Sequence, residues 1–215
     1  MIVGDAQAWA DRFVSLDERF LDRVAAHWPA CLAGLGPSPL EDAITISLVD
    51  RLSRDPLVRR LCHFVAYQHE PFGVAADGTR FSKGRIDMAV LFGWERERYL
   101  AYECKRLCVP AAGGRASLAT AYVTEGMMRF ITEQYAHTLP MGCMLGYVID
   151  GDVAFAERQI QAAITAHGSL ATLNGPSRLP PLSGHVRFET EHGRAGPGIR
   201  LRHTLLSCPN AAVCA

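Results

Sequence analysis

The chain has 215 residues, of which 49% are hydrophobic and 20% charged, and its 22 basic side chains balance its 22 acidic ones. This size predicts one globular domain with a sizeable core, and zero net charge disfavours a non-specific nucleic-acid binder, which is usually basic. Neither a signal peptide nor a membrane-spanning stretch is expected. The seven cysteines follow no disulfide spacing, which is typical of reduced thiols in a cytoplasmic protein.

Two amphipathic helices are expected at the N-terminal end. The first covers residues 5–28 and stops at Pro29, because apolar side chains recur every three or four positions. The second runs from about residue 39 to residue 53, where the apolar positions step by four. Ser38 followed by Glu41 has the spacing of a capping box at its start.

A β-hairpin follows these helices. A strand at residues 61–70 and a glycine-containing loop at residues 73–84, which carries Lys83, lead into it. Its two arms, residues 84–91 and 99–107, are rich in aliphatic and aromatic side chains and are joined by a short charged linker.

Charged residues interrupt both apolar arms of this hairpin. Asp87 stands alone in the first arm, and Glu103-Cys104-Lys105 lies within the second. A buried carboxylate costs several kcal/mol unless it is paired or bound to metal. Strand side chains alternate, so Glu103 and Lys105 share one face, and pairing of the arms sets Asp87 beside Glu103. Two converging carboxylates are ligands for Mg²⁺, and Lys105 can orient a metal-bound water.

A plainer interpretation is an ion pair between Glu103 and Lys105 on an edge strand, which contributes little to stability. The apolar residues around them argue against an edge, because an edge strand usually carries polar residues along one whole face. The metal site is therefore the favoured hypothesis, and it requires the two arms to be neighbouring strands.

The pattern Asp87…Glu103-Cys104-Lys105 resembles the signature of the PD-(D/E)XK (restriction-endonuclease-like) nuclease superfamily. Ile86 replaces the proline that usually precedes the aspartate. The resemblance implies an α/β fold with an αβββαβ core, in which helices flank a central mixed sheet. That core covers about residues 38–150 of a single domain spanning 1–215, with a helical extension at 1–37 and a strand extension at 168–215.

The same resemblance implies the roles of individual residues. Asp87, Glu103 and the carbonyl of Cys104 bind Mg²⁺, for which Mn²⁺ substitutes, and Lys105 acts on the attacking water. Many members of the superfamily add a glutamate from the helix before the hairpin, and Glu41 fits that position. Whether Glu41 is a metal ligand or only caps its helix stays open at this point.

The sequence of the C-terminal half predicts alternating helices and strands, as in an α/β core. A helix at residues 117–137 carries Arg129, which either contacts a phosphate in bidentate fashion or lies at the helix surface. The remaining expected segments are a strand at 144–149, a helix at 153–167 with Asp152 as N-cap, an irregular connection at 168–184, and strands at 185–190 and 199–206.

The implied function is cleavage of nucleic-acid phosphodiester bonds, DNA rather than RNA, by a restriction-type or anti-phage defence endonuclease. Arg129, Lys83 and Arg106 are its expected nucleic-acid contacts, and a homodimer or a regulatory partner protein its expected assembly. A non-catalytic subunit that keeps the fold and binds nucleic acid or protein is the alternative. A hydrolase of small phosphorylated molecules is a third hypothesis, although no nucleotide-binding loop supports it.

Overall fold

A seven-stranded mixed sheet forms the centre of the molecule, described by a computed structural model over residues 10–93 and 98–208. Strands β5, β8 and β11 run parallel, and the other neighbours are antiparallel. The order across the sheet is β1 (Phe64–His69), β4 (Ile86–Leu91), β5 (Tyr99–Leu107), β8 (Met141–Val148), β11 (Ile199–Ser207), β10 (His185–His192) and β9 (Thr172–Leu182).

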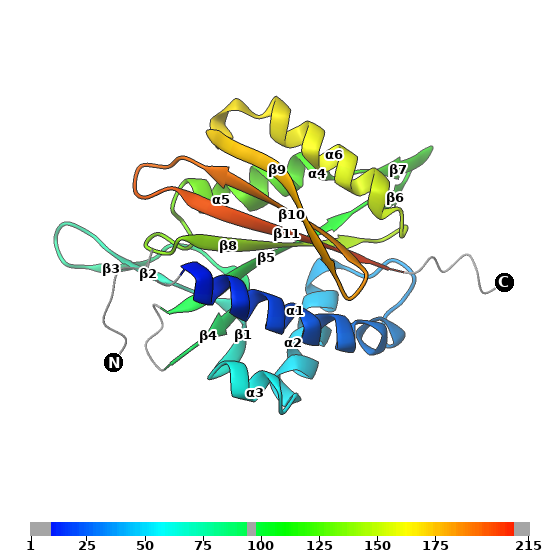
Figure 1. Cartoon of the computed structure of the whole chain (residues 1–215), viewed down its shortest axis with the longest axis horizontal. Helices are drawn as coiled ribbons and strands as arrows, with labels where there is room; N and C mark the ends of the chain where they lie inside the picture. Colours follow the sequence, from blue (N-terminus) through cyan, green and yellow to red (C-terminus); the bar gives the residue numbers. More distant parts are fainter. Residues whose placement is uncertain (1–9, 94–97, 209–215) are drawn as a thin grey trace.

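Helices cover both faces of the sheet, which gives three layers (Figure 1). Phe20 of α1 packs on Tyr102 of β5 with ring centroids 5.3 Å apart, whereas Gly126 lies against the opposite face of β5. The first layer contains α1 (Ala10–Ala33), α2 (Glu41–Arg54) and α3 (Val58–Leu61). The second contains α4 (Ala119–Ala121), the π-helical η2 (Tyr122–Met127), α5 (Met128–Ile131) and α6 (Val153–Ala166), with the 3-10 turn η3 (Gly168–Leu170) after it.

The continuous apolar run of β8 is explained by its place in the sheet. All eight of its residues are buried, because β5 and β11 flank it and helical layers cover its two faces. The hairpin of β4 and β5 is also internal to the sheet. The hypothesis of an ion pair on an edge strand is therefore wrong.

The predicted limits of the first two helices need correction. Pro29 lies inside α1, which continues to Ala33. Proline removes one backbone hydrogen bond, but Trp28 and Cys31 on either side of it are buried, and their packing maintains the helix. The capping box is wrong, since Leu40 is the N-cap of α2 and no side chain caps it. The predicted start of the first helix lies outside the described residues.

Two further predictions fail in the C-terminal half. The helix predicted to reach residue 137 ends at Ile131, because Glu133 and Ala136 adopt left-handed backbone angles that turn the chain back. The connection predicted to be irregular is largely strand β9, which pairs with β10 through several bulges. Asp152 does cap α6, accepting a hydrogen bond from the Phe155 amide.

Two short hairpins were not predicted. One pairs β2 (Phe72–Val74) with β3 (Arg80–Ser82), and the other pairs β6 (Val109–Ala111) with β7 (Gly114–Ala116). The first projects from the left of the molecule (Figure 1). In the part of the chain that the structure describes, no helix is long and apolar enough to cross a membrane.

Candidate metal centre

The site begins where β5 extends beyond β4. The ladder between these strands ends at Met88 and Tyr102, while β5 continues along β8 to Leu107. Backbone N–H groups of alternate residues in a strand point to the same side, so Cys104 and Arg106 face the space that β4 leaves open. Two carboxylates fill it.

Each of these carboxylates accepts one of the freed amides. Asp87 Oδ2 accepts from the Cys104 N–H at 2.8 Å, and Glu41 Oε2 accepts from the Arg106 N–H at 2.8 Å. Asp87 precedes the last paired residue of β4, whereas Glu41 is the first residue of α2. The position of Glu41 is therefore explained by the β5 backbone, not by a capping role.

Together with Glu103, these two residues form what we call the carboxylate cluster. The ammonium of Lys105 lies in its midst. Lys105 Nζ is 2.9 Å from Glu103 Oε1, 3.1 Å from Glu41 Oε1 and 3.8 Å from Asp87 Oδ2. It also donates a hydrogen bond to the carbonyl oxygen of Cys104 at 3.0 Å. Burial lowers the pKa of Lys105, but the charges of Glu103, Asp87 and Glu41 outweigh that effect and raise it, so the ammonium stays protonated.

Glu103 is the carboxylate of the cluster whose charged form is least favoured by its surroundings. It is fully buried, and burial together with the charge of Asp87 raises its pKa to about 8, although Lys105 and Arg129 offset part of the rise. Both cations approach Glu103 Oε1 to 2.9 Å. Neither approach has the angles of a hydrogen bond, and among the described residues Glu103 Oε2 has no hydrogen-bond partner either. Lys105 and Arg129 therefore neutralise part of the charge on Oε1, whereas Oε2 has no such partner within the described residues.

Burial also raises the pKa of Asp87. The ammonium of Lys105 and the hydrogen bond from the Cys104 amide lower it in part, and the charge of Glu41 adds to the rise. Two neighbouring carboxylates with raised pKa values indicate a site in which the negative charge is incompletely neutralised by the protein itself.

Arg129 is held at the edge of the cluster by a residue that sequence reasoning had not assigned. Arg129 Nη1 donates to the hydroxyl of Tyr135 at 2.8 Å, and that buried hydroxyl donates to the carbonyl oxygen of Arg85, just before β4. The Arg129 side chain is 34% exposed. Tyr135 comes after the end of α5, where the chain turns back, so helical spacing carried no signal for its role.

Gly126 is a residue of the site that sequence reasoning missed. A Cβ at this position would lie 3.6 Å from side-chain carbons of both Glu103 and Lys105, and 2.7 Å from the tip of Met144. The absent side chain lets η2 approach β5 closely at the point where the cluster begins.

The donor set fits a hard divalent cation. It contains carboxylate oxygens from the cluster and the Cys104 carbonyl, and Mg²⁺ is typically bound by one or two carboxylates plus waters. Oε2 of the buried Glu103, which has no hydrogen-bond partner within the described residues, is a second point in favour. As the side chains stand, no group of three or more His, Cys, Asp or Glu side chains in the described ranges is arranged to hold an ion, because the Lys105 ammonium lies between the carboxylates.

Two predicted nucleic-acid contacts place their charged groups outside the cluster. Lys83 follows β3 and lines a separate hollow beside the β2–β3 hairpin. The guanidinium of Arg106 donates to the Pro39 carbonyl at 3.2 Å, which ties it to the loop before α2. Of the three side chains, that of Arg129 contacts the cluster, through Glu103, whereas Arg106 contacts it through its backbone amide.

Comparison of the chain with protein families, with curated proteins and with solved structures found no match. The function must therefore be inferred from the geometry of the site.

Proposed function

We propose that the protein is a metal-dependent nuclease that hydrolyses phosphodiester bonds in nucleic acid, with DNA favoured over RNA. The observation that carries the proposal is the convergence of Glu41, Asp87, Glu103 and the Cys104 carbonyl on one cationic position at the end of β5. Lys105, the remaining charged residue of the signature, lies within the same group.

The arrangement of elements supports this proposal. Helix α2 precedes β1, β4 and β5, which pair in antiparallel order, and a helical segment then leads to β8, which runs parallel to β5. This order resembles the αβββαβ core expected of a restriction-endonuclease-like nuclease. Strands β11, β10 and β9 extend the sheet beyond it. By analogy with that fold, we extend the proposal to a restriction-type or defence role.

The residues divide into three roles. Asp87, Glu103, Glu41 and the Cys104 carbonyl hold the cation, with Mn²⁺ as a substitute for Mg²⁺. When bound, the divalent ion polarises the phosphoryl oxygens and lowers the pKa of a coordinated water. Lys105 moves out from between the carboxylates and donates a hydrogen bond to the attacking water or to the charge that develops on the phosphate. Arg129, oriented by Tyr135, contacts the phosphate.

The direct test is a cleavage assay on plasmid DNA, single-stranded DNA and RNA in Mg²⁺, Mn²⁺ or EDTA. Lys105→Ala should fold normally and lose at least about 100-fold in rate, as is usual when a group that stabilises developing charge is removed. Arg158→Ala on α6, which removes an exposed cation elsewhere, should cut like wild type. Full activity of the Lys105 variant would remove Lys105 from the mechanism, and metal-independent cutting would overturn the proposal.

One observation favours a second candidate, a non-catalytic binding subunit. The Lys105 ammonium already neutralises part of the carboxylate cluster without any metal, so the cluster can serve as a structural ion-pair network. Such a subunit would bind nucleic acid or a partner protein equally well in Mg²⁺ and in EDTA. A folded wild-type protein that binds DNA in both conditions and cuts no substrate would favour this candidate.

A further inference from the structure

A buried arginine of the C-terminal extension holds the turn that follows α5. Arg194 lies in the β10–β11 loop (residues 193–198), which runs beside the end of α5 (Figure 1), and its side chain is buried. Its guanidinium donates from Nη1 to the Ala136 carbonyl at 2.9 Å and from Nη2 to the Leu139 carbonyl at 2.8 Å. Both carbonyls belong to the α5–β8 turn (residues 132–140).

A second contact joins the same loop to the same turn. Glu133 Oε1 accepts a hydrogen bond from the Gly196 N–H at 2.7 Å, and Oε2 of the same carboxylate lies 2.8 Å from Nδ1 of His137. The loop therefore holds the turn through a side chain from each segment, Arg194 from the loop and Glu133 from the turn.

The backbone of the turn explains why it needs these contacts. Glu133 and Ala136 have left-handed φ angles of 59° and 51°. Residues other than glycine rarely adopt such angles, and they keep them only where the surrounding structure imposes them. The two contacts with the loop attach at these residues, through the Glu133 side chain and the Ala136 carbonyl.

Tyr135 lies between the two left-handed residues and connects the turn to the candidate site. Its hydroxyl accepts a hydrogen bond from Arg129 Nη1 and donates one to the Arg85 carbonyl. Its backbone N–H donates to the Arg129 carbonyl at 3.1 Å, and the adjacent Gln134 packs on Gly84. The position of the turn therefore sets the position of the Arg129 guanidinium.

We propose that Arg194 is a positioning residue of the nuclease site, which acts on Arg129 through the α5–β8 turn and Tyr135. This inference rests on the proposed function and makes the C-terminal extension a part of the site. In the described part of the chain, Arg194 contacts the turn and its own loop, so it acts at a distance from the carboxylate cluster. Without Arg194 the turn relaxes, and Tyr135 no longer holds Arg129 against the phosphate.

The test is a double-mutant cycle of Arg194→Gln and Arg129→Ala, measured as kcat/KM on the substrate that wild type cuts. Each single variant should lose about 10-fold, mainly through a higher KM, because a charged hydrogen bond to the phosphate is weakened. Arg194→Gln should lose less than about 2-fold more when Arg129 is already absent, because the two residues act as one unit. A residue that only stabilises the fold would cause the same loss in both backgrounds.

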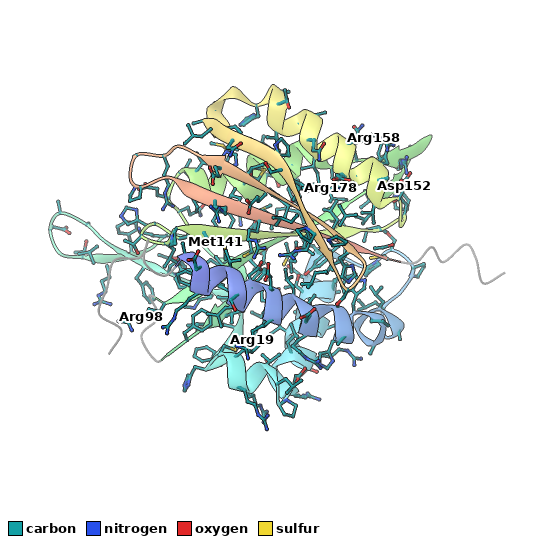
Figure 2. All side chains as sticks on the ribbon, in the orientation of Figure 1. Arg19, Arg98, Met141, Asp152, Arg158 and Arg178 are labelled. Atoms are coloured by element: carbon teal, nitrogen blue, oxygen red, sulfur yellow. The ribbon has the colours of Figure 1, made fainter. Side chains whose placement is uncertain are left out.

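Two controls accompany the cycle. Arg194→Gln should bind Mg²⁺ like wild type in calorimetry, because Glu41 and Asp87 keep their hydrogen bonds to the β5 backbone. Arg178→Gln removes another arginine of the extension, which pairs with Glu157 at 2.9 Å and lies away from the turn (Figure 2). This variant should cut like wild type.

If Arg194→Gln does not fold, Glu133→Ala takes its place in the cycle. This variant removes the contact with the Gly196 amide and leaves Arg194 in position. It should show the same pattern, with a loss of activity that disappears when Arg129 is absent.

The same cycle, measured as affinity for labelled single-stranded and duplex DNA by fluorescence anisotropy in EDTA, separates this inference from the nuclease function. If wild type cuts and Arg194→Gln causes no loss, or equal losses in both backgrounds, the nuclease function stands and this inference is overturned. If wild type cuts nothing but its DNA affinity shows the non-additive pattern, the positioning role stands and the nuclease function is lost. A protein that neither cuts nor binds nucleic acid would overturn both.

Discussion

At the scale of single residues, Asp87 contributes both a hydrogen-bond acceptor and a negative charge to the site. One of its oxygens, Oδ2, accepts the Cys104 amide, which fixes the end of the hairpin, and the same atom lies 3.8 Å from Lys105 Nζ. The hydrogen bond needs only an oxygen, whereas cation binding needs negative charge. Replacing the carboxylate by an amide therefore separates the structural contribution of Asp87 from its electrostatic one.

We expect Asp87→Asn to keep the fold and to bind Mg²⁺ and Mn²⁺ at least about 10-fold more weakly. The amide oxygen can still accept from Cys104, but one negative charge of the donor set is lost. Isothermal titration calorimetry with each metal measures the change, and circular dichroism verifies the fold.

Glu70→Gln is the control for Asp87→Asn. Glu70 is another carboxylate near the hairpin, about half exposed and 3.7 Å from Arg85. Its removal should leave metal affinity unchanged. If the Asp87 variant also retained full affinity, Asp87 would not be a ligand.

At the scale of elements, the glycines of β8 set how closely the second helical layer can pack. A Cβ on Gly142 would lie 2.5 Å from the ring of Phe130, which is fully buried in α5, and 3.0 Å from Leu201. A Cβ on Gly146 would similarly meet Leu107 and Leu205 at 2.6 Å. The segment from α4 to α5, which supplies Arg129, can therefore lie directly on the sheet.

Gly142→Ala should lower the free energy of unfolding by about 1–3 kcal/mol, because overpacking a filled core forces its neighbours apart. Urea unfolding followed by circular dichroism measures the loss. Gly36→Ala, where an added Cβ has no neighbour within 4 Å, should unfold like wild type. Equal midpoints for both variants would show that the helical layer can move away at little cost.

The same scale shows which elements could be predicted from sequence. The β4–β5 hairpin and β8 were predictable, since long apolar runs bounded by turns carry a strong local signal. Strand β9 was not, because it contains three prolines and owes its conformation to pairing with β10, which lies beyond it in the chain. The end of α5 was missed because apolar spacing continues past Ile131, where left-handed residues redirect the chain.

The residues of the candidate site also divide into those that the sequence could predict and those that it could not. Alternation along β5 and the expected pairing were enough to place Asp87, Glu103 and Lys105 together. The contact of Glu41 with the Arg106 amide depends on β5 extending beyond β4, and local sequence carries no sign of that difference in length. The position of Tyr135 depends on where a chain reversal lies in three dimensions.

At the scale of the whole molecule, a buried chain of polar groups connects the two C-terminal strands to the second helical layer. His203 lies between the Tyr122 hydroxyl, 2.9 Å from its Nδ1, and Thr190 Oγ1, 3.0 Å from its Nε2. His192 continues the chain, with Nε2 2.7 Å from the same threonine oxygen and Nδ1 3.0 Å from the Leu170 carbonyl. Burial lowers the pKa of His203 to about 3, and the neighbouring His192 adds to the effect.

This depressed pKa means that His203 contributes a loss of stability in mild acid. The raised pKa of Glu103 contributes in the opposite direction as the pH falls below about 8, so the His203 contribution is read from the difference between wild type and a His203 variant. Below about pH 6.5 a histidine in the unfolded chain binds a proton, whereas His203 in the folded protein stays neutral. The unfolded state therefore binds more protons than the folded state. For this reason the contribution of His203 to the free energy of unfolding falls as the pH falls. The loss should be about 1.4 kcal/mol per pH unit from this residue and should continue toward pH 3. Urea unfolding at pH 7, 6 and 5 measures the slope.

His203→Gln should be less stable at pH 7, because it loses a well-bonded ring, but its stability should fall less than that of wild type as the pH decreases from 7 to 5. His167→Gln, at the C-cap of α6, should keep the wild-type slope. Equal slopes for all three proteins would show that His203 takes up a proton without unfolding.

The prolines of β9 have a consequence for how the protein assembles. Pro176, Pro180 and Pro181 occur in this outermost strand and lie outside its register with β10. Proline offers no N–H to an incoming chain, and bulges interrupt the regular row of donors and acceptors that a template needs. This border of the sheet is therefore a poor seed for fibril growth and for dimers built by continuing the sheet. Two copies that met at this border of the sheet would have to do so through side chains.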